Sequence, residues 1–109
     1  MRTLVRITLL SLLLVIGASC KKRHAIVWIG YNETRCADKW EFNNNREKLK
    51  QNVVAYCKSK GIAIYEIEIF IIGNADACFD CECKTGRQFK CKIENKDLED
   101  AKTEGFFEL

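Results

Sequence analysis

The sequence contains no proline and only one histidine, His24. A Ser–His–Asp or Cys–His mechanism therefore has a single candidate base, and His24 lies far in sequence from any suitable nucleophile. The chain also has no internal repeat, no low-complexity tract and no glycine-rich loop of the kind that binds phosphate. These absences exclude repeat architectures and leave no recognisable catalytic motif.

No apolar run is long enough to span a bilayer, which takes about 20 residues. The longest extends from Ile7 to Ala18, follows two arginines and ends next to the small residue Ser19. A positive start, a short apolar segment and small residues at its end are the parts of a secretory signal peptide. We therefore predict that residues 1–19 are removed on export.

The segment from Ile16 to Cys20 resembles the lipobox of bacterial lipoproteins, although Gly17 stands where the commonest pattern has leucine. The resemblance implies a covalent lipid on Cys20, the first residue of the mature chain, and a membrane as its partner. The order Ser-Cys-Lys-Lys is similar to lipoproteins of Bacteroidota. The alternative is a secreted, soluble protein cut near Ala18. No cofactor other than the lipid is expected.

The mature chain, Cys20–Leu109, is long enough for one small domain with a single core. Residues 20–23 would form the lipidated N-terminus and a short linker, and residues 24–109 the globular domain. Loss of Arg2 and Arg6 lowers the formal charge from +3 by two, so the charge balance indicates no nucleic-acid partner.

Apolar periodicity predicts strands at residues 24–31, 62–72 and 88–93, and helices at residues 45–60 and 96–104. Asn44 with Glu47 forms a capping-box arrangement before the first helix, and Gly61 suits its end. A β-helix-β unit with such a connection should be parallel and right-handed. We expect a small α/β (α+β) domain, β-α-β-β-α, with a three-stranded mixed sheet stabilised by disulfides.

The charges of the last two predicted strands are complementary. If these strands pair antiparallel, Lys90 and Lys92 oppose Glu66 and Glu68. Opposite charges across neighbouring strands are mildly favourable. We interpret the two glutamates as a solvated strand face and not as a catalytic pair.

Seven cysteines are an odd number for an oxidising compartment. If Cys20 carries lipid, six remain as disulfide candidates, and six allow 15 complete pairings. These six are Cys36, Cys57, Cys78, Cys81, Cys83 and Cys91. Such a density is typical of a small exported domain that supplements its core with bridges.

Topology narrows the pairings. Cys36 follows the first strand, and a parallel unit would bring it to the loop that holds Cys78, Cys81 and Cys83, so we expect it to bond to one of these three. Cys57 lies on the inward stripe of the helix.

Cys91 lies on the inward face of the third strand, which favours a Cys57–Cys91 bridge across the core. The alternative is two free, buried thiols that behave as small apolar residues.

Two further hypotheses concern the loop. Cys78 and Cys81 form a Cys-x-x-Cys motif, which could serve thiol–disulfide exchange. The three loop cysteines together with Cys36 could instead hold zinc as thiolates. Structural disulfides are favoured over both, so no catalytic residue and no metal ligand is assigned. Trp40, next to Cys36, is expected to pack against the disulfides, with ligand binding as the alternative.

Three segments are similar to parts of small lipoproteins from Bacteroidota: Glu33–Trp40, Cys81–Arg87 and Lys96–Phe106. That family has no known activity, so the resemblance implies none. In surface-displayed lipoproteins of that phylum an acidic stretch often follows the lipidated cysteine. Here Lys21–Arg23 follows instead, so the resemblance implies the periplasmic face of the outer membrane. We therefore expect a non-catalytic, membrane-anchored protein of the cell envelope that binds a protein or a small molecule.

Overall fold

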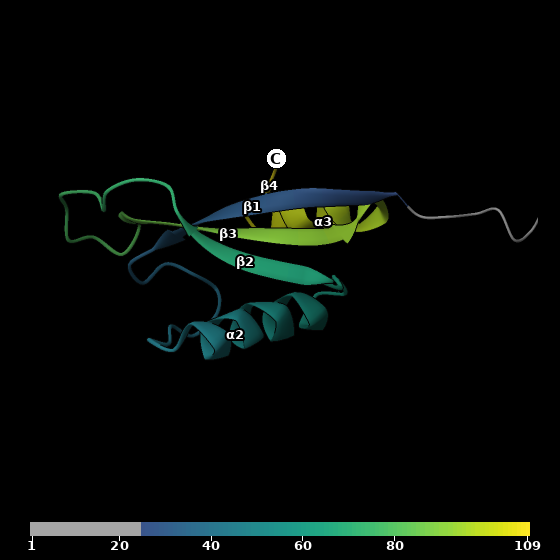
Figure 1. The fold of residues 1–109 in the computed structure, drawn as a ribbon, viewed down its shortest axis with the longest axis horizontal. Coiled ribbons are helices and arrows are strands. Elements are labelled where there is room, and N and C mark those ends of the chain that lie inside the picture. The colour runs from purple at the N-terminus through teal and green to yellow at the C-terminus, as the bar shows by residue number, and fades with distance from the viewer. Residues whose placement is uncertain (1–24) are drawn as a thin grey trace, which may run out of the picture.

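The computed structural model describes residues 25–109, so Cys20, His24 and the predicted signal peptide lie outside it. The domain belongs to the α+β class, as expected (Figure 1). No helix in this part of the chain has the length and apolar character needed to cross a membrane. The elements are β1 Ile26–Thr34, α2 Arg46–Ser59, β2 Glu66–Ile71, β3 Lys84–Glu94, the short 3-10 helix η1 Asn95–Asp97, α3 Leu98–Thr103 and β4 Phe107–Glu108.

The sheet differs from the predicted one. It has four strands in the order β2-β3-β1-β4, and every pairing is antiparallel. β1 and β2 run in the same direction, as a crossover requires, but β3 lies between them and pairs with both. The prediction of a three-stranded mixed sheet was therefore wrong. Antiparallel strands can be joined by a simple hairpin or loop, so β3 can pair with both β1 and β2. β4 has only two residues, which is too short to produce an apolar pattern in the sequence.

The register between β2 and β3 confirms the predicted charge pairing. Glu66 lies opposite Lys92, and Glu68 lies opposite Lys90. The Lys92 Nζ atom is 3.9 Å from a Glu66 carboxylate oxygen. Exposed pairs of this kind contribute little stability but discourage other registers.

Helix α2 begins one residue later than expected. Asn45, not Asn44, is the N-cap residue, because its side-chain oxygen accepts a hydrogen bond from the Lys48 amide at 3.1 Å. Gly61 lies just beyond the helix with φ of +79°, which a side chain would make unfavourable. The amide of Ile62 then donates to the Cys57 carbonyl at 2.9 Å, which ends the helix as predicted.

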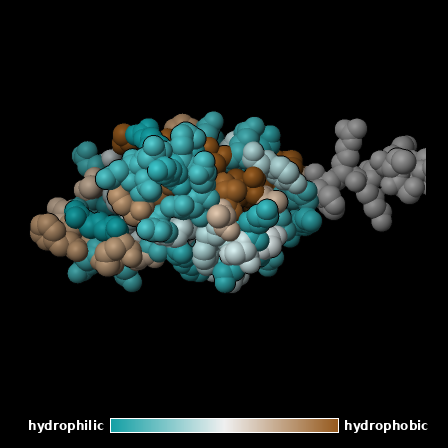
Figure 2. Space-filling model, turned by 90° about the horizontal axis from the view of Figure 1, so that it is seen from below, coloured by the Kyte–Doolittle hydropathy of each residue, from teal (hydrophilic) through white to brown (hydrophobic). Residues whose placement is uncertain are grey.

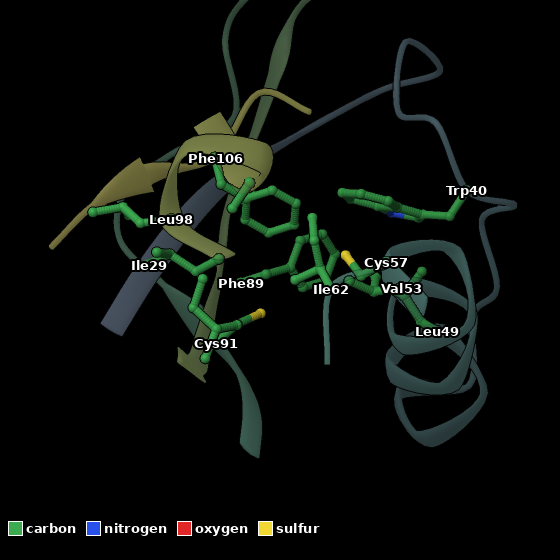
Figure 3. Close-up of a cluster of buried hydrophobic side chains, with 12 residues drawn as sticks. Ile29, Trp40, Leu49, Val53, Cys57, Ile62, Phe89, Cys91, Leu98 and Phe106 are labelled. Atoms are coloured by element: carbon green, nitrogen blue, oxygen red, sulfur yellow. The ribbon is translucent and has the colours of Figure 1, made fainter. Parts of the chain in front are cut away.

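Both helices pack on one face of the sheet and enclose a single core (Figure 3). Trp40 lies at its edge, 7% exposed, and its ring meets Tyr31 edge-on at a centroid distance of 4.6 Å. Trp40 is therefore packed, as expected, but its ring contacts are aromatic residues of the core and not the predicted disulfides. The buried cluster consists of Ile29, Trp40, Leu49, Val53, Cys57, Ile62, Phe89, Cys91, Ile93, Leu98, Ala101 and Phe106.

No described helix covers the opposite face of the sheet. Its edge strand β4 pairs with β1 and places Phe107 on that face. Phe107 packs directly on Gly30, where an added Cβ atom would lie 2.8 Å from the phenyl ring. Gly30 is thus required by a close approach rather than by its backbone conformation.

Candidate functional site

The connection between β2 and β3 projects beyond the end of the sheet (Figure 1). Two disulfides hold it: Cys36–Cys81, with Cα atoms 4.4 Å apart, and Cys78–Cys83, with Cα atoms 6.1 Å apart. Cys36 thus bonds to one of the three expected partners. We call residues 72–83, together with the segment 33–42 to which they are bonded, the loop end.

Main-chain hydrogen bonds add to the cross-links of the loop end. The amides of Arg35 and Cys36 donate to the carbonyls of Cys83 and Cys81 at 3.0 and 3.1 Å. Asp76 is bonded twice to Lys84, through its amide and through its carboxylate. The loop therefore lies against the segment after β1 and is held at both of its ends.

Phe79 is the most exposed large apolar side chain of the described residues, at 94%. It lies between Cys78 and Cys81, so the bridges fix its backbone on either side. The guanidinium of Arg35 lies 5.5 Å from its ring centroid, and Phe42 is also exposed. Figure 2 shows hydrophobic side chains at this tip of the molecule, at the left.

A partly buried ion pair lies next to Arg35 and Phe42. Glu33 is 1% exposed and accepts hydrogen bonds from Arg87 Nε at 2.8 Å, Arg87 Nη2 at 3.0 Å and Thr85 Oγ1 at 2.7 Å. A buried carboxylate needs such a set of donors, because burial alone disfavours its charge. The pair therefore fixes the end of β1 to the start of β3.

Sequence reasoning missed Glu33, Arg87 and Phe79. Residues 27, 29 and 31 alternate inward along β1, so continued alternation would have placed Glu33 on the core face. Arg87 is inward on β3 by the same rule, two residues before Phe89. An aromatic residue enclosed by closely spaced cysteines was the available signal for Phe79.

Two cavities meet at the loop end. One, of about 390 Å³, lies over the Glu33–Arg87 pair, and the second, of about 170 Å³, extends toward Trp40; Arg35 and Phe42 line both. Arg87 is neutralised by Glu33 and also lies 5.8 Å from the Phe42 ring centroid. Aromatic and guanidinium groups around a cavity suit binding rather than proton transfer.

Asp38 organises the turn between β1 and Trp40. One of its carboxylate oxygens accepts from the Thr34 amide at 3.0 Å, from the Thr34 hydroxyl at 2.7 Å and from the Tyr31 hydroxyl at 3.1 Å. Burial, and then the charge of Asp38, raises the pKa of Tyr31 well above its ordinary value. Tyr31 is therefore a structural donor at neutral pH.

The expected Cys57–Cys91 bridge is wrong: both residues are buried, free thiols. Burial raises the pKa of each thiol to about 12, so both are protonated at neutral pH. Disulfide exchange needs a thiolate and also needs Cα and Cβ atoms in a narrow geometry. Two inward positions on facing elements were not sufficient to predict a bond.

The redox and metal hypotheses both depend on loop thiols that are bonded here. Cys78 and Cys81 are not joined to each other, since each is bonded to a different cysteine. The four cysteines proposed as zinc ligands are all in disulfides. Within residues 25–109, no three His, Cys, Asp or Glu side chains form a group that could hold a metal ion.

The carboxylate of Glu104 lies away from the loop end. It accepts hydrogen bonds from Tyr56 at 2.6 Å and from Lys39 at 2.9 Å, and these bonds lower its pKa. The same contact raises the pKa of Tyr56 to about 12. Neither group titrates near neutral pH, so this contact holds α2 to the end of α3 and has no acid–base role.

No protein-family model, no curated protein and no solved structure matches this chain.

Proposed function

We propose that this protein is an exported, lipid-anchored binding protein of the cell envelope, whose partner-binding surface is the loop end. The observation that carries the proposal is Phe79, 94% exposed on a segment closed by two disulfides. Aromatic and arginine side chains dominate the energetics of protein interfaces. A cross-linked loop loses little conformational entropy when a partner orders it further.

The direction of the strands supports this arrangement. β1 starts at Ile26, a few residues after the predicted lipid site at Cys20, and ends beside Cys36 in the loop end. Its nine residues span about 30 Å at about 3.3 Å per residue. The linker allows at most about 20 Å between lipid and domain. Phe79 would therefore face away from the membrane, where a second protein can reach it.

Lys21–Arg23 stand where surface-displayed lipoproteins of Bacteroidota often have an acidic stretch, which supports the periplasmic side of the outer membrane for this protein. Lipid on Cys20 is tested first, by the intact mass of protein purified from membranes. We expect acyl mass on the wild-type chain and release from the membrane in the Cys20→Ser variant. A wild-type protein without lipid mass would contradict the anchor and leave the secreted form.

The binding surface is tested with a photo-crosslinking phenylalanine analogue placed at position 79 in cells. We expect a discrete crosslinked product at 79 and none at Thr103, an exposed control position on α3. The product should disappear when Cys36→Ser and Cys81→Ser are combined, provided that the variant remains folded. Equal products at positions 79 and 103 would show that the loop end has no particular partner.

A further inference from the structure

β2 forms an outer edge of the described sheet, and its apolar side chains are unusually exposed. Ile71 is 73% exposed, and Phe70 and Ile72 beside it are also exposed. An apolar edge strand presents unpaired backbone groups and is a template for pairing with another chain. Natural proteins usually cover such an edge.

The hydrogen bonds to β3 show which backbone groups of β2 face outward. The amide of Ile72 donates to the carbonyl of Gly86, the residue that lies opposite it, at 2.8 Å. Antiparallel ladders alternate, so even-numbered residues of β2 bond to β3. The amides and carbonyls of Ile67, Ile69 and Ile71 therefore point away from the sheet.

An open groove lies beside this edge, on the side of α2. Leu49, Val53 and Cys57 of α2 point into the core. The residue that follows each of these, Lys50, Val54 and Lys58, is rotated by about 100° around the helix axis and lines the groove with Ile67 of β2. The groove measures about 480 Å³ and is lined by Glu47, Lys50, Gln51, Val54, Ala55, Lys58 and Ile67.

We propose that a second copy of this chain pairs with β2 in antiparallel orientation, with the two-fold axis at Ile69. Ile69 then lies opposite Ile69 of the second copy, and Ile67 lies opposite Ile71 of the second copy. The outward backbone groups of both strands are satisfied by each other. The two sheets become one continuous sheet of eight strands.

This register makes the two surfaces complementary. Ile71 of one copy, the most exposed isoleucine of the strand, meets Ile67 of the other copy and the apolar side of its groove, formed by Val54 and Ala55. The contact occurs twice by symmetry.

The charges select the same register. Glu68 lies opposite Phe70 of the second copy, and Glu66 lies opposite Ile72, so no two carboxylates are directly opposed. An axis at Glu68 would oppose two carboxylates, which destabilises a ladder, and an axis at Phe70 would shorten the overlap.

The experiment uses the full mature chain with Cys20→Ser, which removes the lipid acceptor and keeps the protein in aqueous solution. Sedimentation across a range of concentrations gives the dimer dissociation constant. Ile71→Lys should raise this constant by about 100-fold, because two isoleucines lose their burial. Ile26→Lys, the same change at an exposed isoleucine of β1, should leave it unchanged.

The register is tested by isotope-filtered NMR on a mixture of labelled and unlabelled chains. We expect contacts between the methyl groups of Ile67 and Ile71 across the two copies. A protein that is still monomeric at about 1 mM overturns the proposal, since even a weak dimer would be populated there. A dimer that survives Ile71→Lys, or that lacks the Ile67–Ile71 contacts, also overturns it.

Discussion

The loop end and the hydrophobic core of this small domain are stabilised by different chemistry. At the loop end, four cysteines form two disulfides around a segment with few buried apolar side chains. In the core, Cys57 and Cys91 are equally inward and remain thiols. The difference shows that a cysteine next to a helix–sheet contact acts as a small apolar residue where packing suffices, and that covalent bonds are used where it does not.

The largest effect expected of a single substitution separates two phenylalanines. Phe89 is fully buried in the core, and Phe89→Ala should lower the free energy of unfolding by about 3–5 kcal/mol through lost burial and a cavity. Phe79→Ala, at the loop end, should change it by less than about 0.5 kcal/mol. Urea titrations of both variants measure this, and similar losses for the two would contradict the comparison.

A reductant should lower the stability of the protein through the four disulfide-bonded cysteines and not through Cys57 and Cys91. Removal of the two loop disulfides with a phosphine should lower the free energy of unfolding by about 2–4 kcal/mol for each bridge, because the unfolded chain gains freedom. The variant Cys57→Ala/Cys91→Ala should lose the same amount on reduction, since it keeps both bridges. If this variant no longer responds to the reductant, the disulfide assignment is incorrect.

Alkaline pH should lower the stability of the protein through the two free thiols, Cys57 and Cys91. The pKa of Cys57 and of Cys91 rises from 9.0 to about 12 on folding. The protonated thiols thus contribute stability that is complete below pH 9 and is lost as the pH rises toward 12.

The slope is up to about 1.4 kcal/mol per pH unit for each thiol. Urea titrations between pH 8 and pH 11 should show this slope, and Cys57→Ala/Cys91→Ala should flatten it. Tyr31 and Tyr56, whose pKa values are also raised in the folded protein, leave a smaller slope in the variant. A variant as steep as the wild type would show that the thiols do not carry the effect.

The smallest effect tests the start of α2. Asn45→Ala removes the side-chain acceptor of the Lys48 amide and should cost about 1 kcal/mol. Asn44→Ala, one residue earlier, is the matched control and should cost almost nothing. Thermal melts of the two variants measure these losses of stability, and a larger loss for Asn44→Ala would show that Asn44 is the N-cap residue.

Local patterns located α2 closely, but β2 begins four residues after its predicted start, β3 begins four residues before its predicted start, and β4 was not predicted. They predicted the arrangement of the strands poorly. The spacing of Leu49, Val53 and Cys57 located α2 to within a residue, and Gly61 located its end, because both depend on neighbours along the chain. The opposition of Lys90 to Glu68 followed from alternation once an antiparallel hairpin was assumed.

The strand order did not follow in this way. A local pattern cannot show that β3 lies between β1 and β2, since that position depends on which edge of β1 the later chain meets. The site was predicted in part for the same reason. Cys36 was expected near the loop cysteines, whereas Glu33 fell outside the first predicted strand, which ended at Tyr31 instead of Thr34.

The spacing of the two bridges bears on how the chain matures. Cys78 and Cys83 are separated by 5 positions and meet readily in an unfolded loop, whereas Cys36 and Cys81 are separated by 45 and meet less often until β1 and β3 pair. A chain that folds first buries Cys57 and Cys91, which leaves four reactive cysteines and three complete pairings in place of 15. Oxidation before folding exposes all six to the oxidant, so the order of these two events determines the yield of correctly bonded protein.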